Sequence, residues 1–391
     1  MFSERTNWKL SPNRYTQTLE QLRTSGQSLF DLTLSNPTEC HLDYDEEAIR
    51  KAFQNPRALT YEPTAKGLLA ARKEVARYYR EDHGETVDPE SIVLTTSTSE
   101  AYSYIFQLLC NPQDEVLVPK PSYPLFDFLT DLQDVRLVPY QLRYAHGWFM
   151  DFGSIQRALT PKTRAVLLVH PNNPTGSYSK EEEREKLNQI CRERDLALIV
   201  DEVFLDFSLD GQKRQSFAAN SDALTFTLSG LSKIAGLPQM KVAWVVTSGP
   251  TSRTTEAMAR LEIIADTYLS LGSPTQWAIP VLLEQRKRMQ PQLQERIREN
   301  WTYLKLKLSQ TRKYELLETE GGWNAVMRVK QDDTEKWQGD EEFTTELMQS
   351  KKVLVHPGHF YDFACEGHFI ASLITPTGEF RRGIEALLPE G

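Results

Sequence analysis

One lysine stands among small and hydroxyl-bearing residues in the segment Ser229-Gly230-Leu231-Ser232-Lys233. The segment follows the β-rich run 223–228, and its small side chains leave room for a ligand beside the amine. Burial or a neighbouring cation lowers the pKa of a lysine, and the free amine can then form a Schiff base with an aldehyde. A surface loop with a solvated lysine is the alternative, so the other polar motifs have to decide between the two.

A second motif, Ser97-Thr98-Ser99-Glu100, joins a strand expected at 92–95 to a helix expected at 100–110. Ser97 and Glu100 have the spacing of a capping box, which marks the N-terminus of a helix. Free backbone N–H groups and the helix dipole make such an end a binding site for anions, above all phosphate. An ordinary capped helix is the alternative.

Asn173 lies in the segment His170-Pro171-Asn172-Asn173-Pro174, directly after an apolar run at 165–169. Each proline restricts the residue before it, so the amide of Asn173 is expected to project as a fixed hydrogen-bond donor. A simple tight turn would not need two asparagines between two prolines. We therefore favour a binding role for Asn173.

Two carboxylates, Asp201 and Glu202, follow the apolar run 197–200. A carboxylate at the end of a buried strand is costly unless a cation or a metal pairs with it, although a helix cap would also explain Asp201. Glu202 is expected to point the other way and to be structural. Tyr123, in Pro121-Ser122-Tyr123-Pro124, is suited to stacking on a planar ring, although tyrosines beside prolines are also common in turns.

Short apolar runs alternate with helical patterns through the middle of the chain, which predicts an α/β fold with a largely parallel sheet. The expected strands lie at 92–95, 115–118, 135–138, 165–169, 197–200 and 223–227. After residue 275 the pattern changes to long charged helices up to about residue 309 and then to a short α+β stretch. We expect a large domain at 46–275 and a small domain formed by 1–45 and 276–391, which includes the N-terminal arm with a helix at 15–23.

The composition is that of an ordinary globular protein, with 391 residues, 40% apolar and 25% charged. A formal net charge of −9 argues against binding to nucleic acid or to an anionic membrane. The cysteines lie far apart without the spacing of a metal site, which suits a reducing compartment. Neither a signal-type N-terminus nor an apolar run of about 18 residues is found. We expect a cytoplasmic protein without a metal or a membrane span.

Taken together, and in this order along residues 35–376, the motifs resemble those of the class I/II aminotransferase family, which are fold type I enzymes that use pyridoxal 5′-phosphate (PLP). The resemblance implies a large domain with a mixed, mostly parallel sheet and a smaller α+β domain. It implies that Lys233 forms the Schiff base with the cofactor and later carries the transferred proton. Asp201 would pair with the ring nitrogen and keep it protonated, so that the ring stays an electron sink.

The resemblance also implies further contacts with the cofactor. Asn173 would donate to the phenolic oxygen of the ring, and Tyr123 would stack on its face. Ser97, Thr98 and Ser99, together with Ser232 or Ser229, would hold the phosphate. Tyr61, in a Tyr-x-Pro-x-x-x-Gly segment, matches the tyrosine that reaches the phosphate of the neighbouring subunit, which implies a homodimer with shared sites.

Three positions depart from the family pattern. Lys241 stands where the family usually has an arginine on the phosphate, and it would act there as a point charge without the bidentate fork. Phe204 replaces a tyrosine that donates to the phenolic oxygen. Ile370, in Gly367-His368-Phe369-Ile370-Ala371-Ser372, replaces the arginine that clamps the α-carboxylate of the substrate.

Because Ile370 stands in place of this arginine, the motifs do not identify the substrate. Either another cation replaces the arginine, with Lys66, Arg14 or His359 as candidates, or the substrate is not a standard α-amino acid. Ser35, Asn36, Asn173 and Ile370 are the residues expected beside the substrate, and His368 is expected at a strand edge rather than in catalysis.

The function expected from these motifs is transfer of an amino group between an amino acid or amine and a 2-oxo acid. One alternative is a PLP-dependent lyase or decarboxylase on the same scaffold, because a fold does not fix a reaction. The other is a PLP-binding sensor that has lost catalysis.

Overall fold

The computed structural model describes residues 1–330 and 339–388, and its largest sheet has the strand order β2-β9-β8-β7-β6-β3-β4-β5. The bounds are β2 (Ile92–Thr95), β3 (Glu115–Lys120), β4 (Arg136–Tyr144), β5 (Trp148–Met150), β6 (Thr163–Val169), β7 (Ala197–Asp201), β8 (Thr225–Gly230) and β9 (Ala243–Ser248). The central strands β4, β3, β6, β7 and β8 pair in parallel, whereas β9 is antiparallel to both its neighbours and β5 is antiparallel to β4. The expected mixed, mostly parallel sheet is confirmed.

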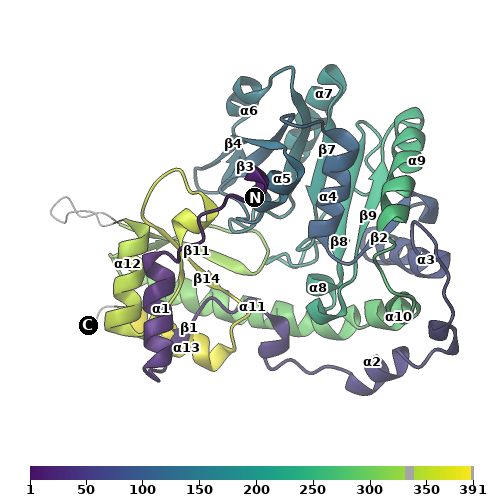
Figure 1. The fold of residues 1–391 in the computed structure, drawn as a ribbon. Helices are drawn as coiled ribbons and strands as arrows, with labels where there is room; N and C mark the ends of the chain where they lie inside the picture. The colour runs from purple at the N-terminus through teal and green to yellow at the C-terminus, as the bar shows by residue number, and fades with distance from the viewer. Residues whose placement is uncertain (331–338, 389–391) are drawn as a thin grey trace.

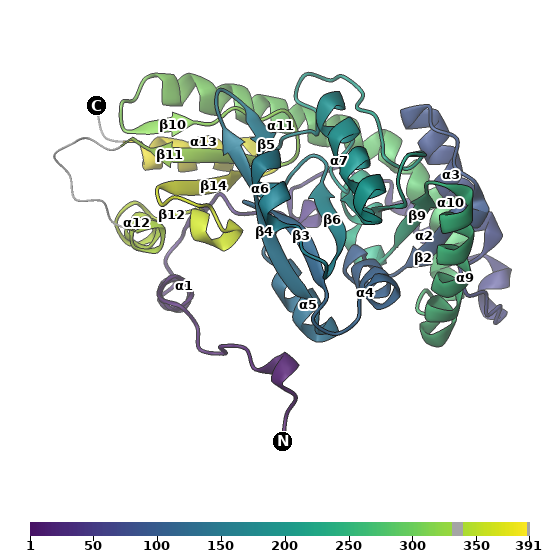
Figure 2. The same ribbon diagram turned by 90° about the horizontal axis from the view of Figure 1, so that it is seen from above.

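Helices cover both faces of this sheet, as Figures 1 and 2 show. Along β7 the side chains alternate, so that Ile199 packs in the core cluster of α4 and α9 while Leu198 and Val200 pack in the cluster of α6 and α7. The bounds of the helices of this part are α4 (Thr98–Leu109), α5 (Phe126–Gln133), α6 (Phe152–Ala158), α7 (Glu181–Arg194), α8 (Leu231–Ile234) and α9 (Thr251–Tyr268). Burial on two faces explains why the strands are continuous apolar runs.

A smaller part of the chain is built on a four-stranded antiparallel sheet with the order β10-β11-β14-β13. Its strands are β10 (Tyr314–Leu316), β11 (Asn324–Val329), β13 (His356–Pro357) and β14 (His368–Ser372). A parallel pair of β1 (Phe30–Asp31) and β12 (Val353–Leu354) lies beside them, with the helices α1 (Arg14–Thr24), α12 (Asp340–Glu346) and α13 (Thr377–Leu387). The N-terminal helix α1 packs against α12 (Figure 1).

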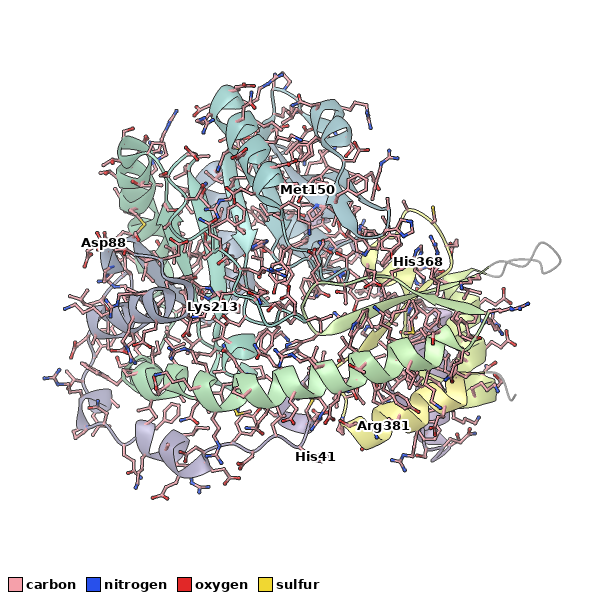
Figure 3. The ribbon with its side chains drawn as sticks, turned by 180° about the vertical axis from the view of Figure 1, so that it is seen from behind. His41, Asp88, Met150, Lys213, His368 and Arg381 are labelled. Atoms are coloured by element: carbon pink, nitrogen blue, oxygen red, sulfur yellow. The ribbon has the colours of Figure 1, made fainter. Side chains whose placement is uncertain are left out.

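Two consecutive helices connect the parts. α10 (Ser273–Glu284) packs in the core cluster of α2 (Glu46–Ala52) and α3 (Leu69–Tyr78), beside the large sheet. α11 (Arg286–Ser309) then runs along the molecule to the small sheet (Figure 3). Its residues Leu293 and Ile297 pack in the core cluster of the small sheet. On this packing we propose that the division between the domains lies within α11 rather than near residue 275. Among the described residues, no helix is both long enough and apolar enough to cross a membrane.

Candidate active site

The carboxyl ends of β6, β7 and β8 meet at one edge of the large sheet, and a cavity of about 420 Å³ opens there. It is bounded on another side by residues of β11 and β14 of the small sheet. Ten of the residues expected from the sequence line it: Ser35, Ser97, Thr98, Ser99, Tyr123, Asn173, Asp201, Ser232, Lys233 and Ile370. Motifs that lie far apart in the chain are thus brought together because parallel strands present their ends at the same edge.

Lys233 lies on the short helix α8, which begins directly after the last residue of β8, Gly230. At position 230 a Cβ atom would lie 2.7 Å from the carbonyl oxygen of Val242, so only glycine allows β9 this close approach. The Lys233 amine lies 4.8 Å from the ring centre of Trp323 and 5.6 Å from that of Phe204. Burial among these groups lowers the pKa of Lys233 to about 8, and the carboxylate of Asp201 opposes that shift.

Asp201 ends strand β7 and is buried, with an exposed fraction of 7%. The hydroxyl of Tyr102 donates to its Oδ2 at 2.9 Å, and the backbone N–H of Val203 donates to its Oδ1 at 3.1 Å. Burial raises the pKa of Asp201 to about 6, against these hydrogen bonds and the charge of Lys233. A cationic or protonated ligand atom beside this carboxylate would favour its ionised form. Tyr102 was not recognised from the sequence, because its place in a helix pattern gives no such signal.

Helix α4 begins as expected at Ser97, whose Oγ accepts from the N–H of Glu100 at 3.1 Å. The prediction of the second hydrogen bond of the capping box, from the N–H of Ser97 to Glu100, is wrong. The carboxylate of Glu100 accepts from the N–H of Thr96 at 2.7 Å instead of from that of Ser97. Ser97, Thr98 and Ser99, at the start of α4, line the cavity, and the first N–H groups of a helix have no partners within the helix.

Asn173 is held by Asn324, which was not recognised from the sequence and which lies at the start of β11. The Nδ2 atom of Asn324 donates to Oδ1 of Asn173 at 2.7 Å, and this leaves the Nδ2 atom of Asn173 as the donor for a ligand. The loop after Asn173 is fixed by Gly176, which has φ +69° and whose Cβ would collide with Thr319 and Gly321. Glycine at this position thus lets the loop lie against the smaller part of the molecule.

Aromatic residues form much of the remaining lining. Tyr123 lies edge-on to Phe126, with ring centres 6.0 Å apart. A hydrogen bond of 3.0 Å joins the hydroxyl of Tyr361 to Nδ1 of His356, and both residues line the cavity. Burial lowers the pKa of His356 below the usual value of an imidazole. These two residues and Trp323 were not recognised from the sequence, because their segment carries no periodic pattern.

Four expected site residues do not line this cavity. The Oγ of Ser229 donates to the carbonyl of Glu202 at 3.4 Å. Successive residues of a strand face opposite sides, so Ser229 of β8 points away from the cavity that its neighbour Gly230 lines. Lys241 is exposed, with φ +52°. Tyr61 is 75% exposed and lines a different depression, beside Leu271. Asn36 uses its side chain to cap the turn at Pro37–Glu39.

None of the three candidate cations for a substrate carboxylate lines the cavity. Lys66 pairs with Glu90 at 2.6 Å, and Arg14 pairs with Glu342 at 3.7 Å. His359 is exposed and does not line the cavity.

Two further polar residues near the site, His368 and Glu202, make contacts that stabilise the fold. His368 is buried on β14 with its ring stacked on that of Phe363, so it lies inside the small sheet and away from the cavity. Glu202 accepts hydrogen bonds from Ser216 and from the N–H of Phe217, and burial raises its pKa to about 7. Its surroundings match the structural role expected for it.

Comparison with known proteins places this arrangement in a family. The glutamate-pyruvate aminotransferase AlaA of Escherichia coli K12 is 31% identical over 266 residues, which are 68% of this chain and 65% of that protein. The match thus spans just under two thirds of that relative's length. An alanine aminotransferase of Mycobacterium tuberculosis H37Rv is 26% identical over 378 residues, covering 94% of this chain and 86% of that one.

A solved structure with the same fold is the alanine aminotransferase of Pyrococcus furiosus, with a TM-score of 0.87 and 22% identity over 99% of this chain and 98% of that chain. The family model for aminotransferases of class I and II matches residues 31–387. Members of this family use pyridoxal phosphate. The chain belongs to the class I and II aminotransferase family.

Proposed function

We propose that the protein is a PLP-dependent aminotransferase that moves an amino group between an amino acid or amine and a 2-oxo acid, with Lys233 as the reacting amine. The observation that supports this most strongly is that Lys233, Asp201 and the first turn of α4 face one cavity. The pKa of Lys233, lowered to about 8, puts its amine within reach of the free form at neutral pH. Such an amine can take up a proton and return it.

The residues of the cavity fit the cofactor. Asp201 would hold the protonated ring nitrogen, which gives its buried carboxylate the cationic partner that the described residues do not supply at hydrogen-bond distance. The free Nδ2 of Asn173 would meet the phenolic oxygen, and Tyr123 would lie against the ring. When bound, PLP would supply an electron sink for the carbon that bears the amino group.

The phosphate group is proposed to lie at the N-terminus of α4. Ser97, Thr98 and Ser99 line the cavity there, and Ser232 adds a hydroxyl from α8. The helix N–H groups and the dipole favour an anion at this place. Gly230, directly before α8, also lines the cavity.

Phe204 lines the cavity where the family usually has a tyrosine. Phenylalanine cannot donate a hydrogen bond to the phenolic oxygen, so Asn173 would be the amide donor left for that oxygen. We expect the bound cofactor to titrate at a higher pH than it would with a second donor, because fewer hydrogen bonds stabilise its anionic oxygen.

Tyr61 is proposed to act in the site of a second copy of this chain. Its exposure of 75% leaves it available for a partner, and it does not line the cavity of its own chain. This proposal makes the protein a homodimer with shared sites. The distant cysteines, none of which forms a disulfide among the described residues, support the further proposal of a cytoplasmic location.

A lyase or a non-catalytic sensor would hold the same cofactor on the same fold. Asp201 and Lys233 favour catalysis over sensing, since each group has a pKa shifted toward neutrality and both line one cavity.

A substitution of Lys233 tests the assignment. Purified Lys233→Ala protein should lose the absorption band of the lysine-bound cofactor and all amino transfer. Lys213→Ala is the matched control, because Lys213 is an exposed lysine of the loop after β7 (Figure 3) and should leave both unchanged. Retention of the band and the activity in Lys233→Ala would refute the role of Lys233.

A further inference from the structure

The small sheet supplies one wall of the cavity, which we call the small-sheet wall: Asn324, His356, Ile370 and Ser372. In the register of this sheet Asn324 lies across from Ser372, and Ile370 lies between Val326 and His356. Residues opposite one another on neighbouring strands share a face, and so do residues two apart on one strand. The pleat of the sheet therefore explains why these four side chains reach the same cavity.

The small-sheet wall carries no fixed charge. Ile370 has an exposed fraction of 1% and packs in an apolar cluster with Leu142, Val326 and Tyr361. Burial lowers the pKa of His356, which disfavours the charged form of its imidazole. Within residues 1–330 and 339–388, Lys233 is the only lysine or arginine that lines the cavity, and it is needed for the cofactor.

A substrate carboxylate against this wall would lose its hydration without gaining a cation. Burying an ionised carboxylate without such a partner is costly, and hydrogen bonds from neutral donors replace only part of the loss. A neutral group of similar size does not incur this desolvation cost.

The wall does offer a neutral polar contact. The Oγ atom of Ser372 has no hydrogen-bond partner among the described residues, although the residue is only 3% exposed. The Nε1 atom of Trp323, another lining residue, is likewise without a partner in that part of the chain and 2% exposed as a residue. Buried donors and acceptors normally have hydrogen-bond partners. A polar ligand group beside Ser372 would therefore remove the free-energy cost of a buried hydroxyl without a partner.

We infer that one substrate of the amino exchange is an amine whose nitrogen-bearing carbon carries a neutral polar group, such as a hydroxymethyl group, in place of a carboxylate. Ile370 disfavours the charged group, and the hydroxyl of Ser372 hydrogen-bonds the neutral one. In the exchange this amine becomes an aldehyde or ketone, while its amino group replaces the carbonyl oxygen of the acceptor. The inference rests on the proposed function, and it also predicts weak binding of any 2-oxo acid acceptor at the same wall.

The decisive experiment measures binding without turnover. Two unreactive ligands, 3-phenylpropanol and 3-phenylpropanoate, differ only in a hydroxymethyl group against a carboxylate. Their dissociation constants for the PLP-loaded protein are measured by isothermal titration calorimetry. We expect the alcohol to bind at least about tenfold more tightly, because the carboxylate finds no cation. Equal or tighter binding of the carboxylate would overturn the inference.

Substitutions in the wall sharpen this test. Ile370→Arg should improve binding of the carboxylate at least about tenfold by adding a bidentate partner, whereas Ile370→Leu should keep the order of the unsubstituted protein. Ser372→Ala should weaken binding of the alcohol about threefold to tenfold and leave the carboxylate unchanged. If Ile370→Arg fails to fold, the comparison on the unsubstituted protein still decides the question.

A turnover assay separates this inference from the proposed function. L-alaninol and L-alanine are compared as donors to the PLP-loaded protein, and formation of pyridoxamine phosphate is followed. Faster conversion by L-alaninol agrees with both proposals, and faster conversion by L-alanine contradicts the inference while supporting amino transfer. If the alcohol ligand binds more tightly but neither donor forms pyridoxamine phosphate, the inference about the wall holds and the proposed amino transfer with these donors fails.

Discussion

At the scale of single residues, burial acts in opposite directions on the two ionisable groups that matter most. It lowers the pKa of Lys233 to about 8 and raises that of Asp201 to about 6, because the charged form of each is disfavoured away from water. Both groups are thereby moved toward neutral pH. Lys233 is therefore more readily in the free-amine form that reacts with an aldehyde. A cationic partner would stabilise the ionised form of Asp201.

The pH dependence of cofactor attachment follows from the lysine. Only the unprotonated amine reacts with the aldehyde of PLP, so the attachment rate of the cofactor-free protein should rise with pH and level off above about 8. Below that pH the rate should fall about tenfold per unit. Stopped-flow absorbance after mixing with PLP measures it. A rate that keeps rising to pH 10 would show that the pKa is not lowered.

The residues that sequence reasoning found are those whose motifs follow strands. Lys233, Asp201 and Asn173 each come directly after an apolar run, and parallel strands bring such positions to one edge. Tyr102 and Asn324 could not be found in this way. Their roles depend on which side chain a helix or an antiparallel strand places opposite a partner, and local sequence does not carry that information.

At the scale of elements, the turn between β8 and α8 depends on close contact with β9. Strand β9 was not among the strands expected from the sequence, yet its pairing with β8 sets Gly230 against Ala243. One expected strand is longer than predicted: the strand expected at 135–138 is part of β4, which continues to residue 144. The apolar pattern marks where a strand lies, whereas its length depends on pairing partners that the pattern does not show.

Gly230→Ala tests this contact. Its Cβ would lie 2.7 Å from the carbonyl oxygen of Val242 and 3.0 Å from Ala243, so the turn that carries Lys233 must shift. We expect a loss of about 1–3 kcal/mol in the free energy of unfolding, measured by denaturant titration of the cofactor-free protein. Gly378→Ala, in α13 with no atom within 4 Å of the new Cβ, is the control and should not destabilise. Equal stability of both variants would contradict the close approach.

At the scale of the whole molecule, the site is assembled from both sheets. The large sheet and the helix α8 that follows β8 supply Asp201 and Lys233, and the small sheet supplies Asn324 and Ile370. The class of fold followed from the alternation of strands and helices. The position of the division between the domains stays a proposal, which rests on the packing of α10 and α11 in different cores.

A complementation experiment tests whether a second copy completes each site. Lys233→Ala and Tyr61→Ala proteins, each of low activity, are unfolded together, refolded as a mixture and assayed. If Tyr61 acts in the partner's site, each mixed dimer has one intact site, and about a quarter of the normal activity should return. Tyr61→Phe serves as a milder control. No recovery in a mixture that light scattering shows to be dimeric would mean that Tyr61 does not act across the dimer.

The central claim, that this cavity transfers amino groups through Lys233, is tested most directly by a half-reaction. Amino acids and simple amines are added one at a time to the purified PLP-loaded protein, and the released cofactor is identified by chromatography. The account predicts conversion to pyridoxamine phosphate by one or a few donors and none in Lys233→Ala. Persistence of PLP with every donor, or consumption of the amine without any pyridoxamine phosphate, would contradict it and favour a sensor or a lyase.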